Sequence, residues 1–268
     1  MTASSTISAP AVRVPDAAGR RLESLSVVLP CFDEAENVAG AIREADEAAG
    51  RFALEHEVIV VDDGSADATR VLAEAVAARN PRVRVVAHDH NRGYGAAVRS
   101  GIDASRSTWV LLTDGDLQFD LEEIELMLPL TREYEVVAGY RIARADPALR
   151  RFAAHAWNGL MRRTFGVTVR DVDCAFKLVR GDAVRSLGLE SDGAMISTEL
   201  YVRAALRGLL VAEVGVHHRP RRAGVPTGGD PRVVLRAFGE RRALLRRLRD
   251  ADRAEARGGR LHGLPKFS

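Results

Sequence analysis

Short, largely apolar runs alternate with amphipathic stretches along the first half of the chain. The runs have the length of buried strands, and the stretches between them repeat apolar residues at helical spacing. The expected strands are 25–29, 58–61, 83–87, 109–113 and 136–139, and the expected helices are 34–49, 66–79, 95–105 and 121–130. This alternation predicts an α/β fold whose mostly parallel central sheet is flanked by helices.

The pattern changes after Tyr140, where an Arg-rich loop is expected over 141–151. Beyond it we expect helices at 152–165, 197–206 and 232–249, strands at 172–179 and 209–216, and a basic loop at 219–229. We therefore predict a disordered amino-terminal arm (1–23), one catalytic domain (24–230), and an Arg-rich amphipathic helix with a tail (231–268).

The amino-acid composition limits the binding partners and the cellular compartment that we expect for this protein. The 268 residues are 46% hydrophobic with a net charge of only +2, which argues against nucleic acid as a partner. Cys31 and Cys174 form no disulfide framework and fit a reducing compartment. No segment resembles a signal peptide or is apolar for long enough to span a bilayer. We expect a cytoplasmic protein that is at most peripheral to a membrane.

Asp114-Gly115-Asp116-Leu117-Gln118 follows the expected strand 109–113 directly. Two carboxylates two residues apart at a strand's carboxyl end can hold one hard divalent cation, because Mg²⁺ and Mn²⁺ prefer oxygen ligands. Such an ion can neutralise a diphosphate leaving group. A solvated turn is the alternative for this short pattern taken alone.

Three more polar loops are expected at the same edge of the sheet, where ligands bind in such folds. The three loops are Pro30-Cys31-Phe32-Asp33-Glu34, Asp62-Asp63-Gly64-Ser65 and Asn91-Arg92-Gly93-Tyr94-Gly95. Taken singly, they have ordinary explanations, which are helix caps, an Asx turn and a tight turn, respectively. In the third loop the glycines, Gly93 among them, would let the backbone approach a ligand. Together with the paired aspartates, they predict a site for a nucleoside diphosphate.

Three rival nucleotide-binding classes lack their motifs. A dinucleotide oxidoreductase needs Gly-x-Gly-x-x-Gly after the first strand, and the residues there contain no glycine. A Walker phosphate loop is also missing. A sugar nucleotidyltransferase would carry a Gly-rich basic loop at the same position, and Pro30–Glu34 is not such a loop.

Together these blocks resemble the family 2 glycosyltransferases of the GT-A fold, in the branch similar to dolichol-phosphate mannose and polyprenyl-phosphate sugar synthases. The resemblance covers residues of about 24–245. It also includes Asp171-Val172-Asp173-Cys174-Ala175-Phe176-Lys177, which resembles a signature of the lipid-phosphate branch with Ala175 where glycine is usual.

The resemblance implies a role for each matching position. Pro30, Phe32, Glu34 and Asp63 would bind the nucleotide, while Asp114, Asp116 and Gln118 would hold Mg²⁺ or Mn²⁺ and through it the diphosphate. Arg141 and Arg221, with Arg222 as a near-equal candidate, would meet donor or acceptor phosphate groups. Asp173 would be the base if the acceptor were a hydroxyl.

The resemblance also implies inverting transfer of a hexose from a nucleoside-diphosphate sugar to a polyprenyl phosphate. GDP-mannose and UDP-glucose types of donor both fit the motifs. Gly224-Val225-Pro226-Thr227 departs from the usual Gly-x-Ser-Lys. A soluble hydroxyl acceptor therefore stays open, and a non-catalytic nucleotide-sugar binder is a third reading. The Arg-rich terminal helix would either lie on an anionic membrane surface or pack as a solvated helix.

Overall fold

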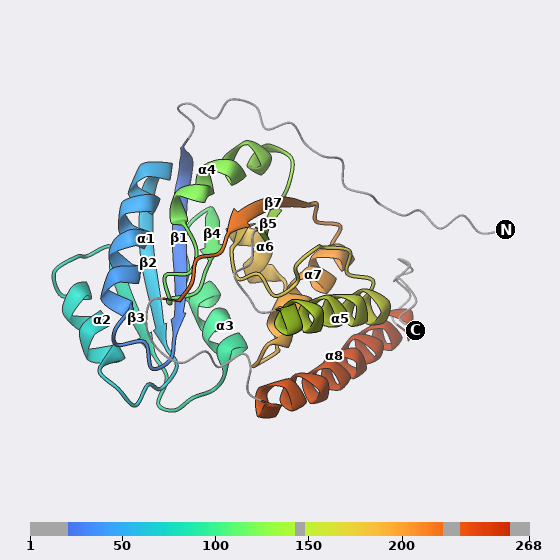
Figure 1. Cartoon of the computed structure of the whole chain (residues 1–268). Helices are drawn as coiled ribbons and strands as arrows, with labels where there is room; N and C mark the ends of the chain where they lie inside the picture. The colour runs from blue at the N-terminus through green and yellow to red at the C-terminus, as the bar shows by residue number, and fades with distance from the viewer. Residues whose placement is uncertain (1–20, 143–147, 222–230, 258–268) are drawn as a thin grey trace.

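The computed structural model describes residues 21–142, 148–221 and 231–257. Seven strands form one sheet in the order β3-β2-β1-β4-β6-β5-β7 (Figure 1). They are β1 (Leu22–Cys31), β2 (Ala53–Asp62), β3 (Val83–Ala87), β4 (Trp109–Leu112), β5 (Val136–Ile142), β6 (Lys177–Arg180) and β7 (Val211–His217). Only β6 pairs antiparallel with its neighbours, so the predicted mostly parallel sheet is confirmed.

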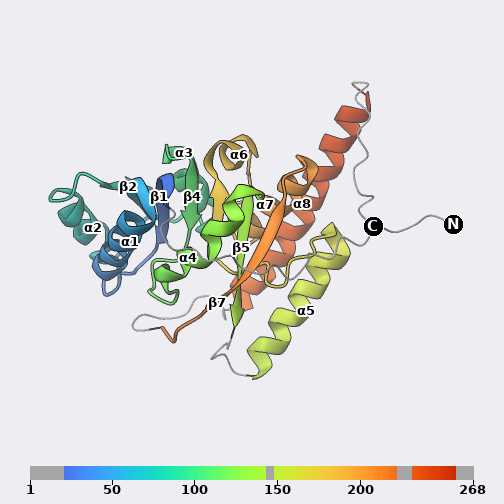
Figure 2. The same cartoon turned by 90° about the horizontal axis from the view of Figure 1, so that it is seen from above.

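Helices cover both faces of this sheet. The α-helices are α1 (Val38–Phe52), α2 (Thr69–Ala77), α3 (Tyr94–Ala104), α4 (Ile124–Met127), α5 (Ala148–Phe165), α6 (Gly181–Ser186), α7 (Met195–Leu206) and α8 (Pro231–Arg257). The core cluster on one face includes residues of α1, α2 and α4, and the cluster on the other includes residues of α3, α6 and α7. Helices α5 and α8 pack against the same face farther from the centre of the sheet (Figures 1 and 2), where Met161, Phe165, Leu244 and Leu248 join the second cluster.

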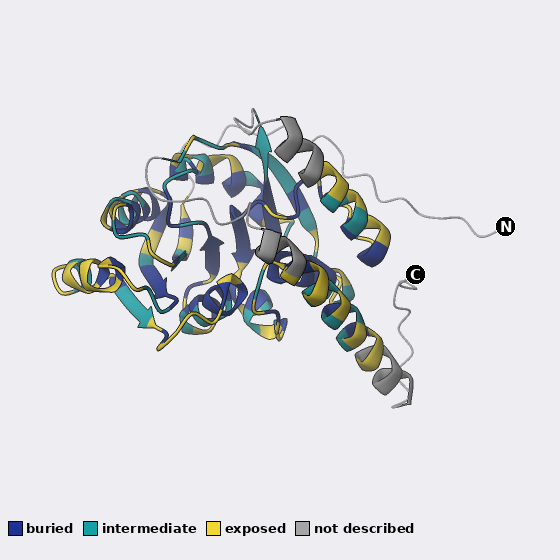
Figure 3. Ribbon diagram, turned by 60° about the horizontal axis from the view of Figure 1, so that its bottom comes forward, coloured by how far each residue is buried: buried dark blue, intermediate teal, exposed yellow. Residues whose placement is uncertain are grey.

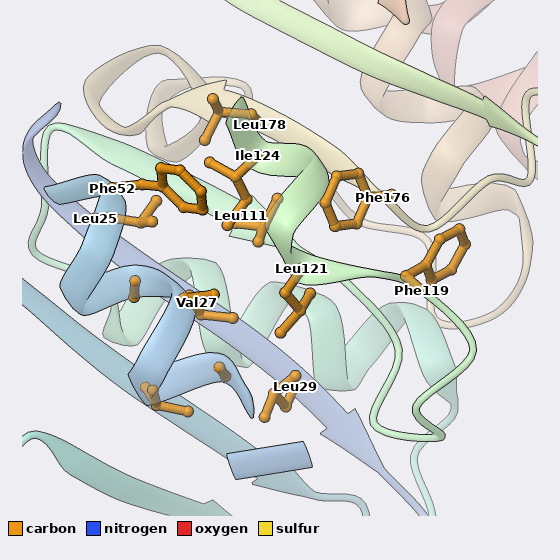
Figure 4. Close-up of a cluster of buried hydrophobic side chains, with 14 of the residues drawn as sticks. Leu25, Val27, Leu29, Phe52, Leu111, Phe119, Leu121, Ile124, Phe176 and Leu178 are labelled. Atoms are coloured by element: carbon orange, nitrogen blue, oxygen red, sulfur yellow. The ribbon is translucent and has the colours of Figure 1, made fainter. Parts of the chain in front are cut away.

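Alternation along the central strand β1 divides the core into these two clusters. Val27 and Leu29 pack on the α1 face, as Figure 4 shows, whereas Val28 packs on the α3 face. Helix α3 comes very close to β1, since a Cβ added at Gly101 would lie 2.2 Å from a methyl carbon of Val28. The sheet is therefore buried on both sides, while the outer faces of the helices are exposed (Figure 3).

The prediction of one regular helix over 121–130 is wrong. The segment is divided into a 3₁₀ turn (Leu121–Glu123), α4, and a second 3₁₀ turn (Leu128–Arg132). Pro129 lies in the second turn. Proline has no backbone N–H and its ring clashes with the preceding turn, which interrupts a regular helix.

The predicted strand 172–179 is also wrong in extent, because only Lys177–Arg180 are strand and the residues before it form turns. Helix α6 was not predicted. Strand β6 runs opposite to its neighbours, with Lys177 opposite Leu112 and Arg180 opposite Trp109. Its amino end therefore lies at the edge where the other strands have their carboxyl ends. This reversal brings residues 171–176 to the edge that carries Asp114.

Several predicted boundaries shift. Strand β1 begins at Leu22, inside the expected arm 1–23, whose residues 1–20 lie outside the described part of the chain. Strand β5 extends to Ile142, so Arg141 belongs to a strand and not to a loop. The predicted carboxyl-terminal helix is present as α8. Within the described residues, no helix is long and apolar enough to cross a membrane.

Candidate functional site

The paired aspartates lie immediately beyond the carboxyl end of β4. Gly115 between them is packed against β1, because an added Cβ would lie 2.6 Å from the Cys31 Sγ. Leu117 has a φ of 62°, a left-handed conformation that is unusual for a residue other than glycine. In this turn the backbone N–H of Gln118 donates to Asp116 Oδ1 at 3.1 Å. The loop thus holds Asp116 and Gln118 on one short, strained turn.

The charges in this loop are poorly compensated by protein alone. Burial raises the pKa of Asp114, although a hydrogen bond from Tyr94 and the charge of Lys177 oppose the rise. Burial, and then the negative charge of Asp114, raise the pKa of Asp116 to about 7. Two adjacent carboxylates that are costly to ionise together are stabilised by a cation between them.

The oxygen-rich set Asp114, Asp116 and Gln118 fits Mg²⁺ or Mn²⁺. Nowhere in the described ranges do three or more His, Cys, Asp or Glu side chains gather as a metal site. Two carboxylates and an amide would therefore share the ion with other oxygens, such as those of a diphosphate, as is usual for Mg²⁺. The role of these residues as metal ligands stays a prediction.

The segment after β7 runs along the aspartate loop. The Arg219 N–H donates to the Gln118 carbonyl at 2.7 Å, and Gln118 Nε2 donates to the Arg219 carbonyl at 2.9 Å. This ties down the Gln118 amide nitrogen and leaves its oxygen as the atom that can face a cation. The imidazole of His217, at the end of β7, pairs with Glu123 at 2.5 Å.

This same segment delivers Arg221 to the site. Its guanidinium forms an ion pair with Glu34 and lies 3.6 Å from Asp116 Oδ2. The structure thus brings together three residues that were predicted from widely separated parts of the sequence. Arg222 and the departing motif 224–227 lie outside the described residues.

The loop after β1 lies beside Arg221. Glu34 Oε2 accepts a hydrogen bond from Asn37 Nδ2 at 2.7 Å, at the start of α1. The Phe32 side chain is 40% exposed, so its ring is open to a ligand at the sheet edge. Pro30 is the penultimate residue of β1 and lies close to Gly115. These positions are compatible with the predicted nucleotide contacts.

Asp63 is held by the protein itself. His88 Nδ1 lies 2.6 Å from one of its carboxylate oxygens, and the N–H groups of Arg92 and Gly93 donate to the carboxylate at 2.9 and 2.8 Å. His88 Nε2 lies 2.9 Å from the Ser100 hydroxyl. Asp63 therefore shapes the 91–93 loop, and its predicted nucleotide contact stays a prediction. Gly93 has a φ of 105°, which glycine adopts readily.

Arg141 is bound to Asp171 by a two-pronged ion pair, with N···O distances of 2.7 and 2.8 Å. Burial alone would lower the pKa of Arg141, but the hydrogen bonds and charge of Asp171 outweigh it and raise the pKa. Arg141 was predicted to lie in the loop after the fifth strand and to meet a phosphate group. The structure places it in β5, largely buried beside the Asp171–Lys177 block.

Two charged residues of that block differ sharply in exposure. The Lys177 side chain is 2% exposed, donates to the Cys174 carbonyl, and lies 3.2 Å from the Ser197 hydroxyl. Burial lowers its pKa, while nearby acids, including Asp173 and Asp114, oppose the shift. Asp173 is exposed, and its carboxylate accepts a hydrogen bond from Trp157.

Two contacts that shape the site were not expected from the sequence. His88 lies against Asp63, and Asp171 pairs with Arg141. Asp171 belongs to the Asp171–Lys177 block, so its place near the site was expected although its partner was not. His88 carried no signal, because its partner Asp63 follows a different strand, β2.

Comparisons with known proteins show the family of the chain. A profile described as Glycosyl transferase family 2 matches residues 26–188. Glycosyltransferase AglD of Haloferax volcanii is 33% identical over 236 residues, covering 84% of this chain and 37% of that protein. Dodecaprenyl-phosphate galacturonate synthase of Rhizobium johnstonii is 32% identical over 217 residues, covering 78% and 63%. The chain thus spans less than two thirds of the length of these relatives.

Solved structures agree on the fold. Glucosyl-3-phosphoglycerate synthase from Mycobacterium tuberculosis, in complex with UDP, superposes with a TM-score of 0.63 at 19% identity, covering 90% of this chain and 87% of that one. The same enzyme with Mn²⁺, UDP and glucosyl-3-phosphoglycerate gives a TM-score of 0.60 at 20% identity, covering 90% and 84%. The predicted GT-A fold is confirmed.

Proposed function

Because the chain belongs to glycosyl transferase family 2, we propose that it is a metal-dependent, inverting transferase. It moves a hexose from a nucleoside-diphosphate sugar to a polyprenyl phosphate. The observation that carries this proposal is the convergence of Asp114, Asp116, Arg221 and Glu34 at one edge of the sheet. Carboxylates for a cation and a guanidinium for phosphate are what a diphosphate leaving group requires.

The residues at this edge of the sheet would have different roles in binding the donor. Asp114, Asp116 and Gln118 would hold Mg²⁺ or Mn²⁺, which supplies positive charge to the departing diphosphate. The Tyr94 hydroxyl and Lys177 lower the pKa of Asp114 against the effect of burial, which favours the ionised form that a cation requires. Arg221 lies next to Asp116, where its guanidinium can bind the same phosphate oxygens. The mycobacterial enzyme complexes that contain Mn²⁺ and UDP support a donor and a metal of this type.

The names of relatives support the acceptor that we propose. Their names include dodecaprenyl-phosphate galacturonate synthase and undecaprenyl-phosphate 4-deoxy-4-formamido-L-arabinose transferase, which points to a polyprenyl phosphate. A phosphate oxygen is already ionised near neutral pH, so its attack on the anomeric carbon requires no strong base. A hydroxyl acceptor is the second candidate, favoured by the exposed Asp173 carboxylate, which could accept the hydroxyl proton.

A thermal-shift panel of nucleoside diphosphates and their sugars, with and without Mn²⁺, tests the donor site. We expect one nucleotide to raise the melting temperature by about 5 °C or more at a hundredfold excess over its Kd, and only with metal. Stabilisation without metal would contradict the metal assignment. No stabilisation by any nucleotide would contradict the donor site as a whole.

The acceptor is then tested with the donor that the panel selects. We expect product with a short polyprenyl phosphate and none with the matching polyprenol, which lacks the phosphate. Transfer to a soluble hydroxyl compound with no transfer to polyprenyl phosphate would favour the second candidate. Donor binding without transfer to any acceptor would favour a non-catalytic binder.

We also propose that α8 contacts an anionic membrane surface, where a lipid acceptor resides. Leu244 and Leu248 are buried against the domain, while Arg246, Arg249 and Phe238 are exposed on the helix. Each basic residue near an anionic surface contributes about 1 kcal/mol to the free energy of membrane binding.

The binding of the protein to phosphatidylglycerol vesicles, measured by co-sedimentation, should fall about tenfold or more in the double variant Arg246→Glu/Arg249→Glu. Equal binding to phosphatidylcholine vesicles would contradict this contact.

A further inference from the structure

The Arg221 guanidinium lies between two acids of the candidate site. Its Nη2 forms an ion pair with Glu34 Oε1, and its Nη1 lies 3.6 Å from Asp116 Oδ2. The side chains of Arg221, Glu34 and Asp116 are only 19%, 11% and 10% exposed, so water and salt screen their charges weakly. Arg221 therefore supplies positive charge to the same Asp116 carboxylate that we propose as a metal ligand.

Glu34 is a fixed partner for this guanidinium. Its backbone N–H donates to the Thr69 hydroxyl at 2.7 Å, and its Oε2 accepts from Asn37 Nδ2 at 2.7 Å. The other carboxylate oxygen, Oε1, accepts from Arg221. The Glu34 side chain is thus oriented by α1 and by the start of α2, and it holds the guanidinium beside the aspartate loop.

The backbone that carries Arg221 is fixed as well. Arg219 and Gln118 exchange the two hydrogen bonds described above, and Phe119 and His218 form an antiparallel bridge. The chain two residues before Arg221 is therefore bound to the aspartate loop. Rotation of the long Arg221 side chain is sufficient to move its guanidinium away from Asp116, because arginine has several rotatable bonds.

A divalent cation at Asp116 would have this guanidinium as a close neighbour. The Asp116 carboxylate already has one positive charge 3.6 Å from Oδ2, and an ion bound by the same carboxylate would add two more beside it. Like charges at short range repel each other strongly where water is largely excluded. The observed position of Arg221 therefore opposes the binding of a cation alone.

A nucleoside diphosphate would change this balance, because it brings anionic oxygens of its own. Arginine binds phosphate through two parallel N–H groups, so a diphosphate can draw Arg221 away from Asp116. Phosphate oxygens are also common ligands of Mg²⁺ and related ions. A diphosphate would thus remove the repulsion and complete the ligand set of the cation at the same time.

We propose that Arg221 couples the binding of the metal to the binding of the donor. Paired with Glu34 and Asp116, it compensates these acids and disfavours a cation that arrives without nucleotide. When the diphosphate binds, the guanidinium turns to the phosphates and leaves Asp116 to the cation. This inference rests on the proposed function, to which it adds control of metal entry by the donor.

Mn²⁺ binding to the variant Arg221→Met, measured by calorimetry on the full chain, tests this coupling. Methionine keeps an apolar stem and removes the charge. Without nucleotide, we expect the variant to bind Mn²⁺ about tenfold more tightly than the parent, a magnitude typical of coupling between sites. At saturation with the nucleoside diphosphate selected by the thermal-shift panel, this gain should disappear, because the guanidinium of the parent then lies on the phosphates.

Further variants show whether the charge acts at the predicted metal site. Arg221→Lys keeps a positive charge and should bind Mn²⁺ nearly as the parent does. Adding Asp116→Asn to Arg221→Met should abolish the tighter binding, since the cation then lacks one carboxylate. Arg82→Met is the matched control: it removes an arginine that pairs with Asp46 at 3.1 Å beside the start of β3, and it should leave Mn²⁺ binding unchanged. If Arg221→Met does not fold, Arg221→Gln takes its place.

The outcomes distinguish the two proposals. A parent protein that binds no nucleotide with Mn²⁺ contradicts the proposed function itself. A parent that binds, together with an Arg221→Met variant whose Mn²⁺ affinity without nucleotide is unchanged or weaker, overturns only the coupling by Arg221. Tighter binding that is equal with and without nucleotide, or that persists after Asp116→Asn, also overturns it, because the effect would then not depend on the diphosphate or on the aspartate.

Discussion

Asp116→Asn is expected to lower kcat by about 100-fold or more, since loss of charge stabilisation on a leaving group costs several kcal/mol in the transition state. The same change should leave the metal-free protein at least as stable as its parent. The buried Asp116 carboxylate and the half-buried Asp114 carboxylate repel each other, and the amide removes this repulsion while keeping the shape. Opposite effects on activity and stability are typical of a residue retained for function.

The measurement is initial rates at saturating donor and Mn²⁺, with melting temperatures taken in EDTA. Asp103→Asn, on the exposed face of α3, is the matched control and should change neither quantity. Turnover within a few fold of the parent, or substantial activity in EDTA, would remove Asp116 from the metal site.

Arg141→Ala is expected to lower the free energy of unfolding by about 3 kcal/mol, because removing one partner leaves the other as an uncompensated buried charge. The Arg141 and Asp171 side chains are only 14% and 8% exposed, and they are joined by two hydrogen bonds. Urea denaturation measures this loss, with Arg43→Ala on the exposed face of α1 as the control.

The double variant Arg141→Ala/Asp171→Ala separates structure from catalysis. It should recover most of the lost stability, since neither charge is then left alone. If Arg141 also meets phosphate, as predicted, turnover should stay low in the double variant. Full recovery of both stability and turnover would show that the pair is structural.

The alternation of apolar runs and helical stretches predicted the parallel part of the sheet well, because burial on both faces leaves a strong local signal. Strands β1 to β4 end in the polar loops that had been noticed, and the loops converge as expected. The reversal of β6 left no such signal. Strand direction is set by tertiary pairing and not by local pattern, so the strand predicted at 172–179 was placed too early.

Partners of charged side chains were the least predictable feature. Arg141 was expected to meet a phosphate group, and its guanidinium is paired with Asp171, thirty residues away in the sequence. Asp63 was expected to face a nucleotide, and its oxygens accept from His88 and from the 91–93 loop. Such pairs form only when distant elements meet. The motifs indicated which residues gather at the site, and the fold determines which of them bind each other.

The central position of β6 has a consequence for how the chain folds during synthesis. Strand β4 can join β1 as soon as both have left the ribosome, but its other edge pairs with β6, about seventy residues later. Strand β5 emerges in between, and both of its neighbours, β6 and β7, follow it. A nascent chain that ends before Lys177 therefore exposes an unpaired edge of β4 and an isolated β5. Unpaired edges are prone to aggregation, so we expect this intermediate to be the stage at which the growing protein depends most on chaperones.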